Sequence, residues 1–504
     1  MAFQEDSIQE ITITLPDISS SDIYAERVVG TEGLDMLYGF WVSVISNEAI
    51  DGEKILGRAA KIKIRVFDEE MKVNGIVTSF RAQDPSASMN RCYEVLIEPE
   101  MALMALSSQN QVYGTNEDVS VIDIVANEMS DGNKSGSSTG SSRQARSIQH
   151  RMLAAAGDYP TLEFTMQYME SDFNFVSRLC ERFGIFYSFD HDGDKETVIF
   201  GDRKEHFRKL SGANLTEELS YQNVEETRAR GDFYIQSFHS ERQARPGGVQ
   251  LRDYNYATAS VDLSVEEKTA SKGFGVCVYY DENYKDKSEG TMIAKRRAER
   301  FEAEKLIFRG ESNIPNIRPG LFFKLVDHPE SALEQYYVIL EVKHEITQPT
   351  PLGFSSASLE TKPYRNSLVC MPFDVPYRPA LKTKKPIVAG PVIGFVDLDE
   401  ISDTGCYRVR LMAEESGLSD GKASCWVRKM EAYGGGAGFG THSVLRKGTE
   451  VLLTFERGDP DRPIILGAMS NSTHSSVTDN RDIGIAMRTK TTSGVVFQIS
   501  DGGE

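Results

Sequence analysis

The 504-residue sequence predicts a mainly β fold with a few helices, in which two β-barrels precede a smaller five-stranded barrel and a short strand-rich tail. Three observations support this prediction. Short segments in which polar and apolar residues alternate, as in half-buried strands, recur along most of the chain. Apolar residues at helical spacing are confined to a few segments. The length corresponds to roughly three domains of ordinary size.

Composition and charge narrow the functional class. Hydrophobic residues make up 40% of the chain and charged residues 26%, as in ordinary globular proteins. No apolar run reaches the roughly 18 residues that cross a bilayer, so we expect no membrane anchor. The formal net charge of −19 argues against nucleic acid as a partner. The acidic start, MAFQED, predicts no secretory signal and therefore synthesis in the cytoplasm.

The N-terminal region is predicted to be a barrel of short strands, at 11–15, 61–66, 76–80 and 93–97. A helix follows, because the segment from Ser120 to Asp123 resembles a capping box and the apolar residues after it keep helical spacing. Residues 132–147, GNKSGSSTGSSRQARS, hold no large apolar side chain. We expect a flexible insertion there, because such a segment cannot bury enough surface to offset its chain entropy.

The middle of the chain combines helices with strands. Ser171 is placed to cap a helix that Gly184 ends, and a charged helix is predicted at 290–304. Strands are expected around these helices, at 162–166, 185–189, 196–200, 306–310, 320–326 and 337–344. The segments that follow Gly57 and Gly320 resemble each other weakly, which fits two related barrels in one chain.

Prolines between Pro349 and Pro386 predict a linker at 366–385, after a two-barrel region at 1–365. Five short strands follow within 386–470, at 388–398, 407–412, 424–430, 450–456 and 463–469. This number suits a small Greek-key barrel of the oligonucleotide/oligosaccharide-binding (OB) type. Between the last two strands, a GDPDRP segment predicts a rigid structural turn, formed by Gly458, Asp459, Pro460 and Arg462.

Several motifs resemble those of one family. They are CWVR at 425–428, the glycine run at 434–440, GTEVL at 448–452 and GDPDRPIILG at 458–467. A second group lies between Tyr159 and Gly184 and includes ESDF at 170–173. Together these segments resemble the VgrG family, the trimeric spike of the type VI secretion system and a relative of contractile phage tail hubs.

This resemblance implies an architecture and a set of partners. Two barrels per subunit would let three chains form a ring of pseudo-six-fold symmetry on a hexameric Hcp-like tube. The OB barrel would form a neck, and residues 471–504 would begin a trimeric β-helix needle whose core includes Val495, Phe497 and Ile499. Further implied partners are baseplate proteins, a PAAR-like tip protein and effectors. Such a spike is assembled in the bacterial cytoplasm and ejected to the extracellular space or a target cell.

Motifs that could carry chemistry are weak. GSSTG at 136–140 matches a nucleophile elbow by letter but lacks its flanking strand and helix. DHDGD at 190–194 lacks the glycine and the bidentate glutamate of an EF-hand loop. The glycine run at 434–440 has no phosphate-binding register, and the eight histidines form no H-x-x-x-H pair. We therefore predict no catalytic, cofactor-binding or metal-binding residue.

Alternatives remain open at this level. A phage-type hub could carry a cell-wall hydrolase, although such a domain needs on the order of 100 residues. The OB barrel could bind carbohydrate, although Trp426 is expected in the core rather than on a binding surface. The residues at 403–409 and Leu445 depart from the family's usual pattern. The machine could therefore be a type VI system, a phage or an extracellular particle.

Overall fold

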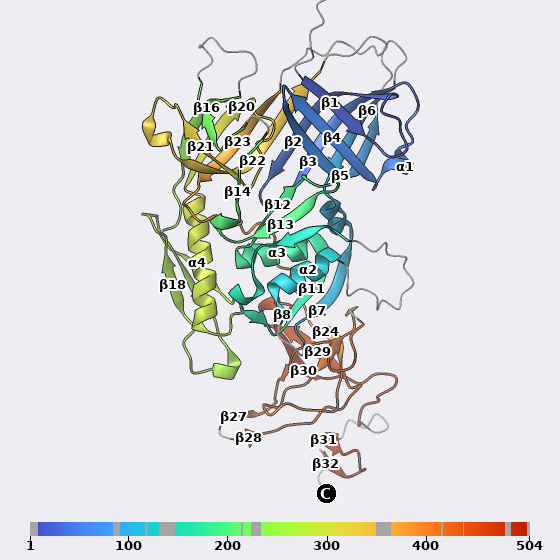
Figure 1. Ribbon diagram of the computed structural model, residues 1–504. Helices are drawn as coiled ribbons and strands as arrows, with labels where there is room; N and C mark the ends of the chain where they lie inside the picture. The colour runs from blue at the N-terminus through green and yellow to red at the C-terminus, as the bar shows by residue number, and fades with distance from the viewer. Residues whose placement is uncertain are drawn as a thin grey trace, which may run out of the picture.

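The computed structural model describes residues 9–83, 91–115, 119–130, 147–212, 215–222, 233–348, 364–414, 417–436, 438–478 and 485–500. It is mainly β with few helices, which confirms the predicted fold class. Figure 1 shows a wide body of sheets with helices beneath it, a side lobe built on one long helix, a terminal barrel and a tail. The predicted flexible insertion lies almost entirely outside the described residues.

The elements fall into these regions in chain order. The first half of the body holds β1 (Gln9–Thr14), β2 (Ile23–Gly33), β3 (Met36–Ser46), α1 (Gly52–Ile55), β4 (Ala59–Val66), β5 (Glu69–Ala82) and β6 (Arg91–Glu98). The layer beneath it holds β7 (Ser108–Tyr113), β8 (Val119–Ser120), α2 (Val121–Ser130), β9 (His150–Met152), β10 (Thr161–Leu162), β11 (Thr165–Ser171), α3 (Asp172–Phe183), β12 (Phe186–Asp190) and β13 (Thr197–Gly201).

The second half of the body holds β14 (Arg208–Lys209), β15 (Glu218–Ser220), β16 (Ile235–Arg242), β20 (Leu306–Ser312), β21 (Leu321–Val326), β22 (Tyr336–Thr347) and β23 (Arg365–Pro372). The side lobe holds β17 (Gly248–Arg252), β18 (Val265–Lys268), β19 (Cys277–Tyr280) and α4 (Lys287–Ala303). The terminal barrel and tail hold β24 (Val392–Val396), β25 (Val409–Leu411), β26 (Arg428–Lys429), β27 (Gly434–Gly436), β28 (Phe439–Gly440), β29 (Glu450–Phe455), β30 (Pro463–Ala468), β31 (Ile485–Lys490) and β32 (Val496–Ser500).

The body sheet consists of two halves with the same strand order. The first half runs β1-β4-β5-β6-β3-β2, and the second runs β15-β21-β22-β23-β20-β16. An isolated bridge between Tyr221 and Ile235 joins the end of β15 to β16 and so curls the second half back upon itself. The weak echo around Gly57 and Gly320 therefore marks a repeated topology, since each glycine, with φ of 72° and 80°, precedes the equivalent strands β4 and β21.

The β-bulges of the two halves also correspond. A bulge adds one unpaired residue to a strand and bends it, so its position is a specific feature of a sheet. Two bulges of the first half have counterparts in the second: Val77/Ser79 of β5 corresponds to Ile339/Glu341 of β22, and Ala25/Arg27 of β2 corresponds to Ile235/Ser237 of β16. A further irregularity of β2, between Thr31 and Gly33, has no counterpart in the described part of β16. Equivalent bulges give the halves equivalent curvature.

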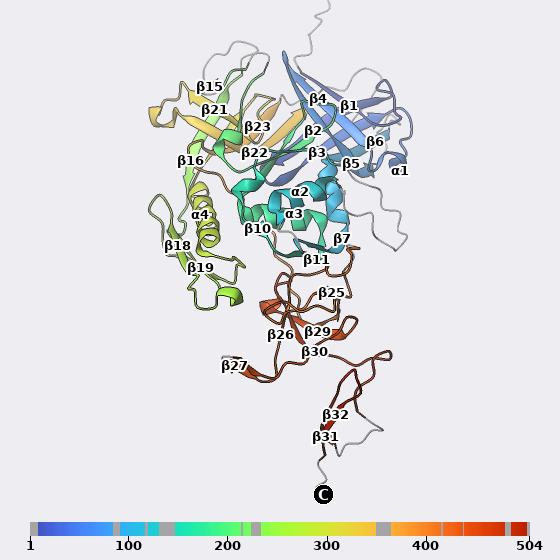
Figure 2. The same cartoon turned by 60° about the horizontal axis from the view of Figure 1, so that its bottom comes forward.

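The side lobe is an insertion into the second half. Its elements lie between β16 and β20, where the equivalent strands β2 and β3 are joined by a tight turn. The helix α4 covers one face of the three-stranded sheet β18-β17-β19, with Val249, Leu251, Ile293 and Phe301 in the shared core. Figure 2 shows this lobe standing beside the body.

A single strand pair joins the two halves. β2 pairs antiparallel with β22, from Arg27 opposite Thr347 to Gly33 opposite Glu341. Beneath this seam, the buried Glu32 carboxylate lies 2.9 Å from His344 Nε2 and 3.0 Å from Arg318 Nη1. Burial alone would raise the pKa of Glu32, but Arg318 and His344 outweigh it and lower the pKa to about 2.

One side chain fills the gap between β1 and β2, which are not paired with each other. The buried amide of Gln348 accepts a hydrogen bond from Ile11 N (2.9 Å) and donates to the carbonyls of Ile11 (3.0 Å) and Ala25 (2.5 Å). The side-chain amide thus replaces a backbone peptide at this position of the first half. Its bonds satisfy groups that would otherwise be buried without partners.

Local signals account for the helices. Ser171 caps α3 by accepting from Asn174 N, and Gly184 ends it in the left-handed conformation at φ 67°. Both predictions are confirmed. α4 begins at Lys287, before the predicted start at residue 290, because Asp286 caps it by accepting from Ser288 N and Glu289 N. Among the described residues, no helix is both long enough and apolar enough to span a membrane.

The terminal barrel contains all five strands that the sequence predicts, each somewhat shorter. Its sheet runs β25-β24-β29-β30-β26, and a bridge between Tyr407 and Val427 joins the two outer strands. The linker differs from the prediction. β23 extends to Pro372 and pairs with β20 and β22, so the linker begins after Pro372 rather than at residue 366. Pro372 ends the strand, where its missing N–H does no harm.

We expect Gln348→Met to lower the free energy of unfolding by about 1–3 kcal/mol, because it leaves the buried N–H and C=O of Ile11 unpaired while keeping a side chain of similar length. Chemical denaturation of the purified chain measures this. Gln83→Met, at an exposed position, is the matched control and should change stability by less than about 0.5 kcal/mol. Equal effects of the two substitutions would show that Gln348 does not hold β1 in place.

Candidate functional site: the junction of body, side lobe and terminal barrel

The turn between β29 and β30 has a backbone that few residues adopt. Arg457 and Gly458 are both left-handed, at φ 52° and 78°. A Cβ on Gly458 would lie 2.5 Å from Ile387 Cγ2, so no side chain fits there. Asp459 Oδ1 accepts from Asp461 N at 2.9 Å, and Pro460 is buried within the turn. Of these residues, Gly458, Asp459 and Pro460 are those that the sequence singles out for a structural turn, together with Arg462.

Asp461, which the sequence did not single out, fastens this turn to the body and to the linker. Its buried carboxylate accepts from Met166 N (2.7 Å) and Thr165 Oγ1 (3.2 Å) at the start of β11. Lys385 of the linker lies 2.6 Å from Asp461 and 2.5 Å from Asp459. Burial by itself raises the pKa of Asp461, but Lys385 and then Arg178 outweigh it and hold the pKa below its usual range.

Arg462 fastens the same turn to the side lobe. Its guanidinium lies 2.6 Å from Asp253, pairs with Asp281, and donates to Asn283 at 3.0 Å. The side chains of Asp253 and Asp281 are only 1% and 7% exposed. These carboxylates raise the pKa of Arg462 despite its burial. One six-residue turn of sequence therefore contacts three separate parts of the chain.

Apolar packing accompanies these charges. Val112, Phe164 and Met166 of the body belong to the same core cluster as the apolar strands of the terminal barrel, among them Val451 and Ile465. The barrel is consequently packed onto the underside of the body rather than hanging from the linker alone.

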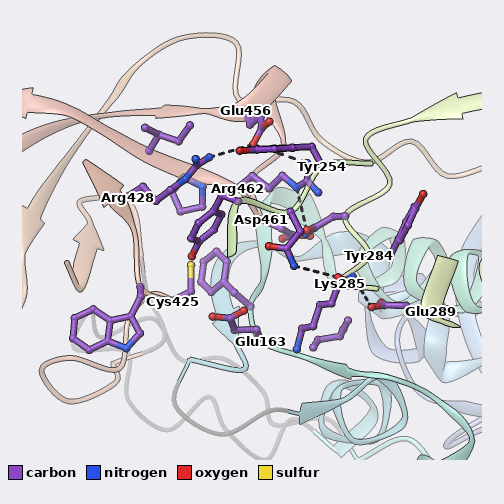
Figure 3. Close-up of a pocket in the computed structure, with 18 of the residues that line it drawn as sticks. Glu163, Tyr254, Tyr284, Lys285, Glu289, Cys425, Arg428, Glu456, Asp461 and Arg462 are labelled. Carbon is purple, nitrogen blue, oxygen red and sulfur yellow. Dashed lines mark hydrogen bonds and ion pairs between the residues drawn. The ribbon is translucent and has the colours of Figure 1, made fainter. Parts of the chain in front are cut away.

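A cavity of about 130 Å³ lies at this junction, between β10, the side lobe and the barrel. Figure 3 shows Glu163, Tyr254, Cys425 and Arg428 around it. The Arg428 guanidinium stacks 4.3 Å from the Tyr256 ring, and Arg408 lies 4.7 Å from the ring of Trp426. Trp426 is half-buried in the cavity wall, so the prediction that it belongs to the core is wrong.

The cavity offers little nucleophilic chemistry. Burial raises the pKa of the Cys425 thiol to about 12, with Glu163 adding to the effect, so the thiol stays protonated. The lining includes no histidine that could act as a base. Among the described residues, no group of three or more His, Cys, Asp or Glu side chains is placed to hold a metal ion.

The remaining candidate residues lie apart from this junction. DHDGD at 190–194 forms the turn after β12, where Asp190 lies 2.7 Å from Arg208. The glycine run at 434–440 supplies the short hairpin β27–β28. GSSTG at 136–140 lies outside the described residues. In the tail, β31 and β32 form an antiparallel hairpin on which Val495, Phe497 and Ile499 are 65%, 58% and 48% exposed.

Two protein-family models match this chain. A model of the phage tail baseplate hub (GPD) matches residues 31–350, well over half of the chain. The chain belongs to this baseplate hub family. A second model, the type VI secretion system/phage-baseplate injector OB domain, matches residues 393–469, which cover the terminal barrel of this hub protein. The VgrG resemblance read from the sequence is thereby confirmed.

Curated relatives of this hub protein are spike proteins. The type VI secretion system spike protein VgrG4b of Pseudomonas aeruginosa is 26% identical over 476 residues, which cover 90% of this chain and 55% of that protein. The actin cross-linking toxin VgrG1 of Vibrio cholerae is 27% identical over 453 residues, covering 87% of this chain and 39% of the toxin. The chain thus spans about half the length, or less, of these relatives.

Solved structures share the hub fold. The E. coli c3393 protein, described as a component of the type VI secretion system similar to T4 bacteriophage tail proteins gp27 and gp5, superposes with a TM-score of 0.61 at 21% identity. The match covers 91% of this chain and 99% of that one. The lidded Francisella PdpA-VgrG complex matches with a TM-score of 0.60 at 10% identity, over 98% of this chain and 76% of the other.

We expect Arg462→Gln to lower the free energy of unfolding by about 3–5 kcal/mol, because it leaves the buried carboxylate of Asp253 without its cation and leaves Asp281 with only the more distant Arg457, at 3.8 Å. Hydrogen exchange should accelerate in residues 253–284. Arg446→Gln changes an exposed arginine of the terminal barrel, and should alter stability by less than about 0.5 kcal/mol. Unchanged exchange in the side lobe of the Arg462 variant would contradict the fastening role.

Proposed function

We propose that the chain is the structural hub and spike subunit of a contractile injection machine of the type VI secretion kind, acting as a homotrimer that caps the tube and pierces target envelopes to deliver effectors. The observation that carries this proposal is the order of parts: a baseplate hub region at 31–350 precedes an injector OB domain at 393–469 in one chain. The named spike proteins among its relatives support the same role.

The repeated half-sheets support the trimer. Within the chain, β2 of the first half pairs with β22 of the second. The strand equivalent to β2 is β16, and the strand equivalent to β22 is β5. If a pseudo-six-fold axis relates successive halves, β16 of one subunit pairs with β5 of the next in the same way. Three chains then close a ring of six half-sheets.

The equivalent bulges give the register of this contact. Thr31 is opposite Lys343 at the internal seam. Thr31 and Glu241 lie the same number of residues after the equivalent bulges of β2 and β16, so they are equivalent. Lys343 and Arg81 are equivalent by the same count from the bulges of β22 and β5. Glu241 of one copy would therefore face Arg81 of its neighbour, and the two charges are complementary. Both side chains are at least partly exposed in the single chain.

The proposed partners follow from this ring. A hexameric Hcp-like tube protein would stack on the pseudo-six-fold body, baseplate proteins would surround it, and a PAAR-like tip protein with its effectors would sit beyond the tail. Assembly in the bacterial cytoplasm followed by ejection fits these partners. We assign no catalytic role to the residues that the structure describes; the hub region followed by an injector OB domain favours a structural subunit over the cell-wall hydrolase and carbohydrate-binding alternatives.

We also propose that the tail begins a trimeric needle. Its hairpin exposes Val495, Phe497 and Ile499 together with Met487, which is 50% exposed. An isolated two-stranded hairpin is marginally stable in water. Three tails around one axis would bury the apolar row and pair the free strand edges.

The ring proposal predicts a specific cross-link. Facing residues of an antiparallel pair have Cα atoms about 4.5–5.5 Å apart, within disulfide range. We expect the double variant Arg81→Cys with Glu241→Cys to form covalent trimers under mild oxidation, seen on a non-reducing gel. Lys72→Cys with Glu241→Cys, which uses the far end of β5, and each single variant should stay monomeric on that gel. A monomeric mass for the native wild type would overturn the proposal.

For the tail, we expect Phe497→Asp to speed hydrogen exchange in 485–500 and to loosen the lower end of the trimer, because three carboxylates would meet in an apolar core at a cost of several kcal/mol. The neighbouring Gln498→Asp lies on the opposite face of the strand and should leave exchange unchanged. Equally fast exchange in the wild type and in Phe497→Asp would show that no needle forms here.

A further inference from the structure

Five arginines gather where α3, α4 and the linker meet. Arg182 lies in the last turn of α3, Arg296, Arg297 and Arg300 lie on α4, and Arg378 lies in the linker. They line a small cavity of about 10 Å³, on the scale of one water molecule. Figures 1 and 2 both show α4 alongside α3. We refer to these five residues as the arginine cluster.

Part of this positive charge has a partner within the chain. Arg297 Nη1 lies 2.9 Å from Glu282, and Arg378 Nε lies 2.7 Å from Glu299. Arg182 donates to the carbonyls of Glu282 and Asn283, at 2.7 and 2.9 Å. Arg378 also donates to the carbonyls of Gly184 and Asp202, so these bonds use two or three of the five N–H groups that each guanidinium carries.

Within the part of the chain that the structure describes, four buried N–H groups of the cluster have no hydrogen-bond acceptor, although one of them, on Arg300, lies 3.8 Å from Glu304. They are Nε of Arg182, Nη1 of Arg296, Nε of Arg297 and Nε of Arg300. Arg297 and Arg300 are only 6% and 8% exposed. Within the described part of the chain, Arg182 and Arg296 have no carboxylate at ion-pair distance. Buried charged donors without acceptors are rare in native structures and call for an explanation.

The carboxylate nearest the cavity does not supply the acceptors. Glu181 lines the cavity, but its oxygens accept from Lys382 N and Thr383 N, each at 2.9 Å, and from Thr383 Oγ1 at 2.8 Å. The cavity wall at Gly184 is tightly packed as well. A Cβ on Gly184 would lie 2.9 Å from Arg378 Cδ and 3.1 Å from Arg296 Cδ.

We propose that the arginine cluster binds one small monovalent anion of the chloride class. The four residues that carry these donors line one small cavity, whose size admits a monatomic ion after small shifts of long side chains but excludes a phosphate or a sulfate. Burial, with the Arg378 guanidinium nearby, lowers the pKa of Arg296, and an anion would relieve that repulsion. A bound anion would join the linker to α3 and α4.

Halide binding can be tested on the full chain. Crystals soaked in sodium bromide should show one anomalous peak between Arg296, Arg297 and Arg300. The melting temperature in sodium chloride should be about 2–4 °C higher than in sodium fluoride at equal ionic strength. This difference should level off as the salt concentration rises, as expected for a ligand that binds the folded state. Fluoride is the control because its tight hydration disfavours a guanidinium site.

Variants separate the site from general salt effects. Arg296→Gln should abolish the difference between chloride and fluoride, whereas Arg309→Gln, at an exposed arginine paired with Glu241, should retain it. The absence of a bromide peak, or an equal chloride response in both variants, overturns the proposal and leaves water as the occupant. If Arg296→Gln does not fold, the bromide crystal of the wild type decides. Neither outcome depends on the proposed trimer or its function.

Discussion

The antiparallel pairing of β2 with β22 is the constraint on which the rest of the molecule depends. It makes two similar half-sheets into one continuous sheet, in which residues 27–33 pair in register with residues 341–347. Glu32, buried beneath this pair, is held ionised by Arg318 and His344, which come from the second half. A buried carboxylate in that position would be strongly unfavourable without the partners that the second half supplies, so Glu32 ties the two halves to one relative position.

The repeat explains why the side lobe exists where it does. In the first half, β2 and β3 are joined by a tight turn, whereas the equivalent connection from β16 to β20 carries the whole lobe. An insertion at a turn leaves the sheet register undisturbed. The lobe then reaches past the body and meets the terminal barrel through Asp253 and Asp281.

Apolar packing and ion pairs both hold the terminal barrel against the rest of the chain. The apolar cluster shared by Val112, Phe164 and the barrel strands supplies attraction without direction. Asp461 and Arg462 supply direction, since each is hydrogen-bonded to a different part of the chain. Apolar surfaces alone allow sliding, so these directed bonds set the orientation of the barrel on the rest of the chain.

Local patterns in the sequence determined much of the fold: the alternation of the strands, the Ser171 and Gly184 ends of α3, and the five strands of the terminal barrel all depend on neighbouring residues. The prolines misplaced the start of the linker, because pairing with β20 and β22 keeps β23 extended up to Pro372. Tertiary structure alone decided what the GDPDRP turn contacts. Arg462 meets Asp253 across 209 residues of chain, and no local pattern records such a pair. The same holds for the equivalent bulges and the arginine cluster, because they arise from side chains and strands that only the folded chain brings together.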